Sequence, residues 1–480
     1  DILGAWVNKN LACAHCKRCA RRCEVLESPA LDIGLIEADF GRVKEMPPEQ
    51  RGEAVLELVQ KRPELYHALR RCCFCGHCTA TCATHMTAAA RMREWREFFM
   101  LAGLMPLNDS KIVMVDNEWH IFSAYRAIYN VAYPEFTPLP DVAEAKAGAE
   151  AGAAAGSAGT SAEAGAGAEA GAAAVTGAIA DTRADAGARA GAIDTLFFPG
   201  CSLASYAPEL TRHVGHWLDD NGYRWALSTE CCGSPLMSAG LSERSKALRL
   251  KLLEQIRAAG ITRVLTVCPG CGEELGEIMG DEVDIIPLPE LLLKHPVDKN
   301  GTVSNGNLPN ANSGPAPHNV ASVAGSGAPL DSPAPPSVTF FDSCHDRFDT
   351  RHGTAVRKLL AQRLPTTAQV EMAHHGKDTL CCGAGGAVAA YDSELTQRRV
   401  RRVLDEARAT TATTLVTTCP TCTYTIAQAL LGAGDDGSGI EGRNYLELVF
   451  GQTIDWAKVF DELEAMWTGE YGPWLTETFF

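Results

Sequence analysis

One arrangement of five cysteines occurs twice in this chain, and it constrains the fold more than any other feature. Each copy reads Cys…Cys-Cys-Gly…Cys-Pro-x-Cys. The second cysteine of the adjacent pair and the cysteine that precedes proline are 36 positions apart in the first copy (232 to 268) and 37 in the second (382 to 419). Thiolates at repeated spacings indicate bound metal, and the duplication predicts two sites facing each other across a pseudo-two-fold axis. The ten candidate ligands, which are also the candidate catalytic residues, are Cys201, Cys231, Cys232, Cys268, Cys271 and Cys344, Cys381, Cys382, Cys419, Cys422.

Composition narrows the class of protein. The 480 residues allow roughly two to four domains. All 19 cysteines fall in short motifs of a long and otherwise ordinary chain, which favours thiolate metal sites in a reducing compartment over a secreted disulfide scaffold. The net charge of −16 argues against nucleic-acid binding, because neutralising phosphates requires basic clusters.

Targeting and membrane signals are not recognised in the sequence. The longest apolar run, residues 98–107, is about half of the roughly 18 residues that a membrane span needs. Arg21 and Arg22 lie between cysteine ligands and do not form a twin-arginine leader. We therefore predict a cytoplasmic protein without a membrane span of its own.

Two low-complexity stretches divide the chain. Residues 141–192 are mostly Ala and Gly, and residues 298–337 are rich in Asn, Gly, Ser, Ala and Pro. Neither has apolar periodicity, so both are predicted to be flexible linkers. The predicted domains are a helical domain over 1–140, a first cysteine-rich domain over 193–297, and a second over 338–480 with a C-terminal tail.

The segment before the first linker is predicted to be mainly helical. Residues 53–59 and 88–104 have helical apolar spacing, with Trp95, Phe98, Phe99 and Leu101 on the expected core stripe. The C-terminal aromatic residues predict either a docking site for a partner or a tail that covers a hydrophobic edge: Trp467, Tyr471, Trp474, Phe479 and Phe480.

Strands and helices alternate in both later segments. Predicted strands at 195–198, 224–227 and 264–267 precede the cysteines of the first copy, and strands at 338–341 and 415–417 precede those of the second. Helices are expected between them, one of them ending at Gly260. This order predicts an α/β fold with a parallel or mixed sheet in each segment, and cysteines beyond the carboxyl ends of the strands.

The N-terminal segment contains two further cysteine runs. Cys13-x2-Cys16-x2-Cys19-x3-Cys23 and Cys72-x2-Cys75-x2-Cys78-x3-Cys82 have the spacing of paired cubane [4Fe–4S] clusters, in which the fourth cysteine of each run ligates the other cluster. From that pattern, one set is Cys13, Cys16, Cys19 and Cys82, and the other is Cys72, Cys75, Cys78 and Cys23.

Some residues near these runs depart from the pattern or have no assigned part in it. Glu24 and Ala83 replace the proline that often follows the fourth cysteine. Cys73 is surplus and is predicted to be a packed thiol or a weak neighbour of the ligands. The nearby histidines are predicted to be hydrogen-bond donors or surface residues rather than ligands: His15, His77 and His85.

The chain resembles the iron–sulfur subunits related to heterodisulfide reductase, which have an N-terminal dicluster ferredoxin domain and two CCG cysteine-rich domains. Phe198-Pro199-Gly200-Cys201 and Asp342-Ser343-Cys344-His345 are similar to the leading-cysteine motifs of that family, although Pro is common where Ser343 stands. The group also includes electron-transfer subunits of anaerobic glycerol-3-phosphate, glycolate and lactate oxidation and of sulfite-reduction complexes. The resemblance covers nearly the whole chain outside the linkers.

The resemblance implies that each five-cysteine set holds a noncubane [4Fe–4S] cluster. Gly233 and Gly383 would allow unusual backbone angles beside it, and Pro269 and Pro420 would stiffen the turns before helices whose N-terminal amides face an anionic cluster. The alternative is a structural zinc in one or both repeats, although five thiolates exceed the usual four ligands of zinc. His345 is a candidate to tune the cluster or supply a proton, or else a plain neighbour of the ligands. His374 and His375 are candidate proton donors to a leaving thiolate or ordinary loop residues.

Two functions follow as hypotheses. The first is reduction of a small or protein disulfide between the repeats, with electrons arriving through the cubane pair. The second is an electron-transfer subunit that links a flavoprotein dehydrogenase to a membrane quinone or cytochrome b-type partner, which would place the protein peripherally on the inner face of the membrane. The glycine-rich run after Cys382 lacks the strand–turn–helix context of a dinucleotide site, so the electron donor is expected to be another protein.

Overall fold

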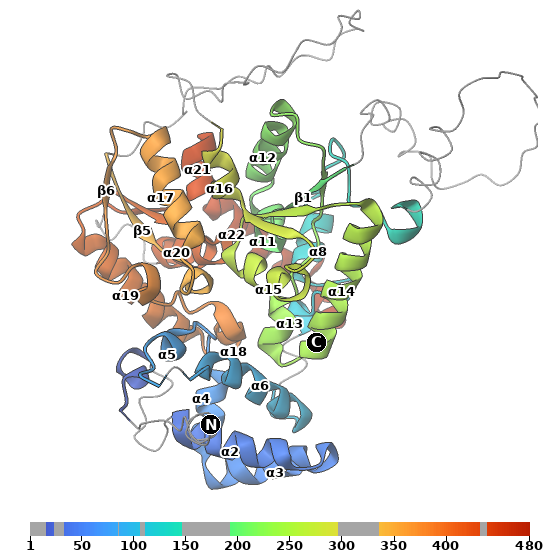
Figure 1. The fold of residues 1–480 in the computed structure, drawn as a ribbon, viewed down its shortest axis with the longest axis vertical. Helices are drawn as coiled ribbons and strands as arrows, with labels where there is room; N and C mark the ends of the chain where they lie inside the picture. The colour runs from blue at the N-terminus through green and yellow to red at the C-terminus, as the bar shows by residue number, and fades with distance from the viewer. Residues whose placement is uncertain are drawn as a thin grey trace, which may run out of the picture.

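The computed structural model describes residues 16–23, 33–84, 86–105, 111–145, 193–295, 336–432 and 439–480. It contains a helical N-terminal region below two α/β units that lie side by side (Figure 1). Cys13, His15, His85 and most of both predicted linkers lie outside the described residues. No helix in the part of the chain that the structure describes is long and apolar enough to cross a membrane.

The N-terminal region is helical, as the apolar spacing predicts. Its elements are η1 (Cys19–Arg22), α2 (Ile33–Glu45), α3 (Pro48–Lys61), α4 (Pro63–Arg70), α5 (His77–Ala80) and α6 (Ala88–Leu101). Trp95, Phe98 and Phe99 are buried in the core of this region, where Trp95 contacts Phe40 edge-to-face. The helices hold the loop of the second ferredoxin-type motif between α4 and α6.

The prediction for Leu101 is wrong, because its side chain is 68% exposed. Leu101 is six residues after Trp95, so at about 100° per residue it lies about 120° from Trp95 around the helix, at the edge of the buried face. The helix ends at the same point, with Gly103 in a left-handed conformation (φ 68°).

Residues 111–145 pack on the first α/β unit. They include η3 (Lys111–Val113) and α8 (Ile121–Ile128), and α8 contacts α11 (Cys201–Tyr206). Further along, Leu139 and Leu227 are joined by a backbone hydrogen bond of 2.8 Å, and the Phe136 ring lies against Gly215. This segment therefore covers the first unit rather than the N-terminal helices.

The first unit, residues 193–295, has a four-stranded parallel sheet in the order β2-β1-β3-β4. Its strands are β1 (Thr195–Phe198), β2 (Trp225–Leu227), β3 (Arg263–Thr266) and β4 (Asp284–Pro287). Its helices are α11, α12 (Pro208–Asp220), α13 (Ser234–Ala239), α14 (Ser242–Ala259), α15 (Pro269–Met279) and α16 (Leu288–Leu293). Gly260 ends α14 in a left-handed conformation, as expected.

The second unit repeats this topology with the order β6-β5-β7-β8, again all parallel. Its strands are β5 (Ser337–Phe341), β6 (Ala368–Val370), β7 (Thr414–Thr417) and β8 (Glu441–Asn444). Its helices are η4 (Cys344–Asp346), α17 (Arg351–Arg363), η5 (Gly376–Asp378), η6 (Gly385–Ala387), α18 (Val388–Tyr391), α19 (Ser393–Ala409), α20 (Pro420–Gly432) and α21 (Tyr445–Phe450). The predicted α/β class with two related units is confirmed.

The two units pack reciprocally. By their order in the chain, α12, α15 and α16 of the first unit correspond to α17, α20 and α21 of the second. α16 contacts α17 and α12 contacts α21, while α15 contacts η4 and α20 contacts α11. Each contact is thus made twice with the roles exchanged, which is the pattern of a pseudo-two-fold axis. One hydrophobic core crosses the boundary and includes Phe197 and Leu265 from the first sheet and Phe340 and Val416 from the second.

The C-terminal tail forms α22 (Trp456–Thr468) and α23 (Gly472–Phe479), which pack against each other, and α22 also contacts α8 and α20. Trp474 contacts Trp119 edge-to-face with ring centroids 5.0 Å apart, and Phe479 is buried. Phe480 and Tyr471 remain exposed. Most of the aromatic tail therefore covers a hydrophobic surface of the chain itself.

Candidate metal centre

The second ferredoxin-type motif forms the loop between α4 and α6, and the described part of the first motif lies beside it. Cys78 is half-buried beside Cys72, Cys23 and Cys19, and desolvation, followed by the nearby thiolates, raises its pKa. Cys78 thus has neighbours from both predicted ligand sets, so the crossed grouping stays a prediction. The short helices η1 and α5, which hold Cys19 and Cys78, are also in contact.

The first five-cysteine set lies at the carboxyl ends of β1, β2 and β3. Cys201 and Cys231 have sulfurs 3.6 Å apart. The thiols of Cys231 and Cys271 donate to the sulfur of Cys232, and these hydrogen bonds lower the pKa of Cys232. Cys268 in turn interacts with Cys271, so the five thiols form one continuous group.

The second set occupies the corresponding ends of β5, β6 and β7. Cys382 and Cys422 have sulfurs 3.4 Å apart, and Cys422 interacts with Cys419. Cys381 accepts a hydrogen bond from Cys344 and also interacts with Cys73 and Cys75 of the ferredoxin-type loop, and all three interactions lower its pKa. The second set is therefore continuous with the N-terminal motif.

The two sets meet directly. The sulfurs of Cys268 and Cys419, which are 151 residues apart in the chain, lie 3.7 Å from each other. These are corresponding positions, the Cys-Pro cysteines of the two copies. The pseudo-two-fold packing thus brings one thiol from each repeat to a common point.

Glycine and proline set the local backbone. Gly233 and Gly383, each directly after its cysteine pair, have φ values of 83° and 87°, which favour glycine. A Cβ on Gly200 would lie 3.2 Å from the Cys271 sulfur. α15 and α20 begin at Pro269 and Pro420, so Cys271 and Cys422 lie within the first helical turn, not before the helix as expected.

The residues fit a thiolate-bound cluster. All 18 described cysteines are free, and every cysteine of the two repeats interacts with at least one other cysteine. Backbone N–H groups of Gly383 and Cys422 donate to the sulfurs of Cys381 and Cys419. Amide donors of this kind stabilise anionic sulfur in iron–sulfur sites. Among the described residues, no group of three or more Cys, His, Asp or Glu side chains has a geometry that could hold a single metal ion.

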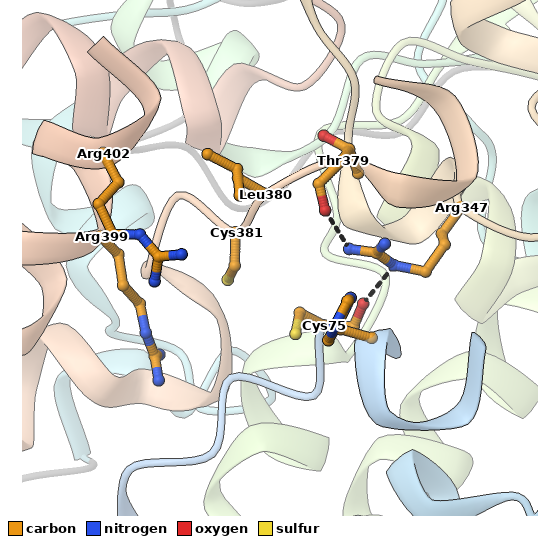
Figure 2. Close-up of a pocket in the computed structure, with 8 residues that line it drawn as sticks. Cys75, Arg347, Thr379, Leu380, Cys381, Arg399 and Arg402 are labelled. Atoms are coloured by element: carbon orange, nitrogen blue, oxygen red, sulfur yellow. Dashed lines mark hydrogen bonds between the residues drawn. The ribbon is translucent and has the colours of Figure 1, made fainter. Parts of the chain in front are cut away.

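Basic side chains surround the point where the second set meets the ferredoxin-type loop (Figure 2). The cavity there has a volume of about 30 Å³ and is lined by Cys75, His77, Arg347, Thr379, Leu380, Cys381, Arg399 and Arg402. Arg347 donates to the carbonyl oxygens of Cys75 and Thr379 at 3.0 and 2.7 Å. Sequence reasoning did not identify these arginines, because Arg347 and Cys75 are 272 positions apart.

A different basic residue lies beside the first set. Arg126, on α8, is near Cys201 and Cys231, and burial lowers its pKa although these thiolates oppose that effect. Its Nη1 donates to the Ser205 hydroxyl at 3.1 Å. Tyr206, which follows on α11, stacks on Tyr424 of the second unit with ring centroids 5.7 Å apart. The first set is therefore covered on this side by α8, while α6 of the N-terminal region packs on α13.

The candidate histidines have separate surroundings. His345 reaches across to the first unit, where Nδ1 contacts a carboxylate oxygen of Glu273 and the ring lies against Gly270. Its pKa is raised because the pairing with Glu273 outweighs burial. His374 contacts Glu406, and Nδ1 of His375 lies 2.8 Å from the Met372 carbonyl oxygen. Of the three, His345 is the one that contacts both repeats.

Comparison with known proteins agrees with this duplicated arrangement. A family model described as CCG, cysteine-rich domain, matches residues 195–276 and 338–427. The chain is 27% identical over 237 residues to an uncharacterized iron–sulfur protein of Methanococcus maripaludis, an alignment that covers 49% of this chain and 41% of the relative.

Two further relatives have functional names, and each is one component of a larger reductase. The chain is 25% identical over 262 residues to a component of the fumarate reductase (CoM/CoB) of Methanothermobacter marburgensis (53% of this chain, 45% of the relative). It is 25% identical over 241 residues to a component of the dihydromethanophenazine:CoB–CoM heterodisulfide reductase of Methanosarcina barkeri (48% and 52%). The chain spans about half the length of the curated relatives it matches.

Proposed function

We propose that this chain, which belongs to the heterodisulfide reductase-related iron–sulfur family with two CCG cysteine-rich domains, is an oxidoreductase subunit that reduces a disulfide where its two repeats meet. The observation that carries the proposal is the 3.7 Å approach of Cys268 and Cys419 across the pseudo-two-fold axis. A disulfide has two sulfurs, and a site with one thiol group from each repeat offers each sulfur a separate partner. The names of two relatives refer to the thiols CoM and CoB, which is consistent with sulfur chemistry.

The residues assigned to the clusters remain those of the sequence motifs. Two cubane [4Fe–4S] clusters would be held by the eight cysteines of the ferredoxin-type motifs, and two noncubane clusters by the ten cysteines of the repeats. Such clusters supply electrons one at a time. Converting one disulfide to two thiols consumes two electrons and two protons, so two separate electron deliveries are needed for each turnover.

The protein around the thiols excludes water and fixes their positions. Most of the ten sulfurs are buried, and the glycines at 200, 233 and 383 let the backbone approach them closely. Burial keeps the local dielectric constant low and strengthens each amide–sulfur hydrogen bond. Since the chain has no dinucleotide motif, we propose that electrons come from a redox partner protein, either a flavoprotein or a membrane cytochrome b-type protein.

One observation favours the alternative, an electron-transfer subunit that links a flavoprotein dehydrogenase to a membrane quinone or cytochrome partner. The cavity between α11 and α20, next to the repeat boundary, has a volume of only about 10 Å³. That volume holds about one water molecule and no organic substrate. A disulfide could therefore enter at this cavity only if α11 and α20 separated, whereas electron transfer requires no such opening.

Two substitutions separate these functions. Cys231→Ser and Cys381→Ser each change one thiol of one repeat, and both should abolish disulfide turnover while the ferredoxin-type EPR signals stay intact. Iron analysis of the anaerobic parent protein provides the control, since four clusters predict about sixteen iron atoms per chain and zinc-filled repeats predict about eight. Unchanged disulfide turnover in both variants would refute reduction at the repeats.

A further inference from the structure

Cys73, the one cysteine outside the repeated spacing patterns, lies at the boundary between the N-terminal helices and the second repeat. In the first ferredoxin-type motif the corresponding residue is Ala14, so the thiol distinguishes the second motif from the first. Cys73 is 5% exposed and packs with Val388 and Leu395 of the second unit. It directly follows Cys72, one of the proposed ligands.

The Cys73 sulfur is held by hydrogen bonds from both sides. Its thiol donates to the carbonyl oxygen of Gly383 at 3.3 Å, and Gly383 follows the Cys381-Cys382 pair. Nη1 of Arg399, a buried residue of α19, donates to the same sulfur. Cys73 also interacts with Cys381. A short path of covalent and hydrogen bonds thus runs from Cys72 to the cysteine pair of the second repeat.

The backbones of the two loops are also in close contact at this point. A Cβ on Gly386 would lie 2.1 Å from the carbonyl oxygen of Cys72, and a Cβ on Gly385 would lie 2.5 Å from that of Cys73. Only residues without a side chain allow this approach. The loop that follows the second Cys-Cys-Gly is therefore shaped to receive the ferredoxin-type loop.

The first repeat meets the N-terminal helices in another way. Arg96 of α6 donates to the carbonyl oxygen of Ser238 on α13 at 2.8 Å, and Gly240 lies against the backbone of Arg96. These two contacts join two helices and involve no thiol, and the same Arg96 guanidinium also donates to the carbonyl oxygens of Cys72 and Gly386. The thiols of Cys231, Cys232 and Cys271 interact with other thiols of their own repeat.

We propose that Cys73, held by Arg399, is a positioning residue for electron transfer, and that electrons pass from the ferredoxin-type segment to the second repeat first and to the first repeat afterwards. This rests on the proposed function. In each transfer the ferredoxin-type segment is oxidised by one electron and the second repeat is reduced by one. The Cys268–Cys419 contact then connects the second repeat to the first. A low-potential redox partner supplies the electrons, and dithionite replaces it in the test.

The test compares Cys73→Ala with Cys73→Ser in the anaerobic, cluster-loaded full chain. Alanine restores the residue of the first motif and removes the hydrogen bond to Gly383, whereas serine keeps a donor. Freeze-quench EPR after mixing with dithionite follows the ferredoxin-type and repeat signals separately. In Cys73→Ala we expect the second-repeat signal to form about tenfold more slowly, the factor that one hydrogen bond of ordinary strength represents at a barrier.

Three results decide the proposal. The ferredoxin-type signals and the iron content should match the parent in both variants, and Cys73→Ser should recover most of the rate. Arg399→Lys should also slow the second-repeat signal, while Arg398→Lys, at an exposed neighbouring position of α19, should not. An unchanged rate in Cys73→Ala, or loss of iron from that variant, would overturn the proposal. Disulfide turnover is not measured, so failure of the disulfide function leaves this result interpretable.

Discussion

The two cysteine-rich repeats have the same five cysteines and the same four-stranded parallel sheet, yet their surroundings differ. The second repeat receives Cys73 and Cys75 at Cys381, with Arg347 and Arg399 beside them. The first repeat is covered by α8, whose Arg126 lies near Cys201. Duplication therefore explains the pair of sites, while residues outside the repeated pattern make the two sites unequal.

The difference between their surroundings matters because it assigns an order of electron transfer to two otherwise similar repeats. Both sets contribute one thiol to the Cys268–Cys419 contact, so either could act on one sulfur of a disulfide. Among the described residues, the hydrogen bonds with thiols of the ferredoxin-type loop are made by the second set at Cys381, and Cys344 interacts with Cys75 through charge. Each of the following changes should therefore affect the two repeats differently.

The largest expected difference is between Cys381→Ser and Cys231→Ser. Since Cys381 is where the ferredoxin-type loop meets the repeats, its loss should leave the first repeat unreduced as well as the second. Loss of Cys231 should leave the second repeat reducible. Low-temperature EPR of dithionite-reduced protein measures both repeats at once. If the two variants lost both repeat signals to the same extent, reduction of the second repeat before the first would be contradicted.

A smaller difference is expected between Gly386→Ala and Gly240→Ala. Both glycines have positive φ, and a Cβ would lie 2.1 Å from the Cys72 oxygen in the first case and 2.5 Å from the Arg96 oxygen in the second. Each alanine should cost about 3 kcal/mol through backbone strain and overpacking, equivalent to roughly 100-fold faster local hydrogen exchange. Exchange should rise at the Cys72 loop in Gly386→Ala and at α6 and α13 in Gly240→Ala.

Gly376→Ala is the matched control for both. Gly376 also has positive φ, but a Cβ there has no neighbour within 4 Å. It should show the strain alone, about 1 kcal/mol, and leave exchange at the boundary unchanged. If Gly386→Ala changed stability and hydrogen exchange only as much as Gly376→Ala does, the close packing of the Cys72 loop on the second repeat would be contradicted.

Much of the fold could be predicted from the sequence, and the misses have physical reasons. The strands before the cysteines are short apolar runs, and Gly260 marks the end of α14 through its left-handed backbone. β4 and β8 were not predicted, because Asp284–Pro287 and Glu441–Asn444 lack a continuous apolar run. All residues of β6 are exposed, so its sequence has no pattern of buried apolar residues from which a strand could be predicted.

The smallest expected effect is a pH dependence of the stability of α8, the helix that covers the first repeat. His120 caps α8 by accepting a hydrogen bond from the Ser123 backbone N–H, and burial lowers its pKa to about 4 from the usual 6.5. The His120 imidazole therefore binds a proton more tightly when α8 is unfolded than when it is folded. Because of this, the free energy of unfolding of α8 decreases as the pH falls from 6.5 to 4. At pH 5.5 the loss should be about 1 kcal/mol.

His120→Asn keeps a capping side chain and removes the titration. Hydrogen exchange of α8 should rise between pH 7 and pH 5.5 in the parent and change less in the variant, while α19 in the second unit serves as the internal reference. The same pH response in parent and variant would show that His120 does not control α8.

The candidate site was less accessible to sequence reasoning than the fold. The cysteines could be found from their spacing, but their partners are set by contacts between distant segments. Arg399 lies 326 positions from Cys73, and the closeness of Gly385 and Gly386 to the Cys72 loop follows from docking of one loop on another. Cys73 itself had a signal, since it is a thiol at a position where the first ferredoxin-type motif has alanine.

EPR of the partially reduced, anaerobic protein decides whether the two sets of five thiols form one composite site. If they do, the signals of the two repeats should be split by their mutual magnetic interaction. Replacing Cys231 with serine should then leave the second-repeat signal unsplit. Two unsplit, additive signals in the parent protein, or an iron content of only about eight per chain, would show that the repeats hold no such site.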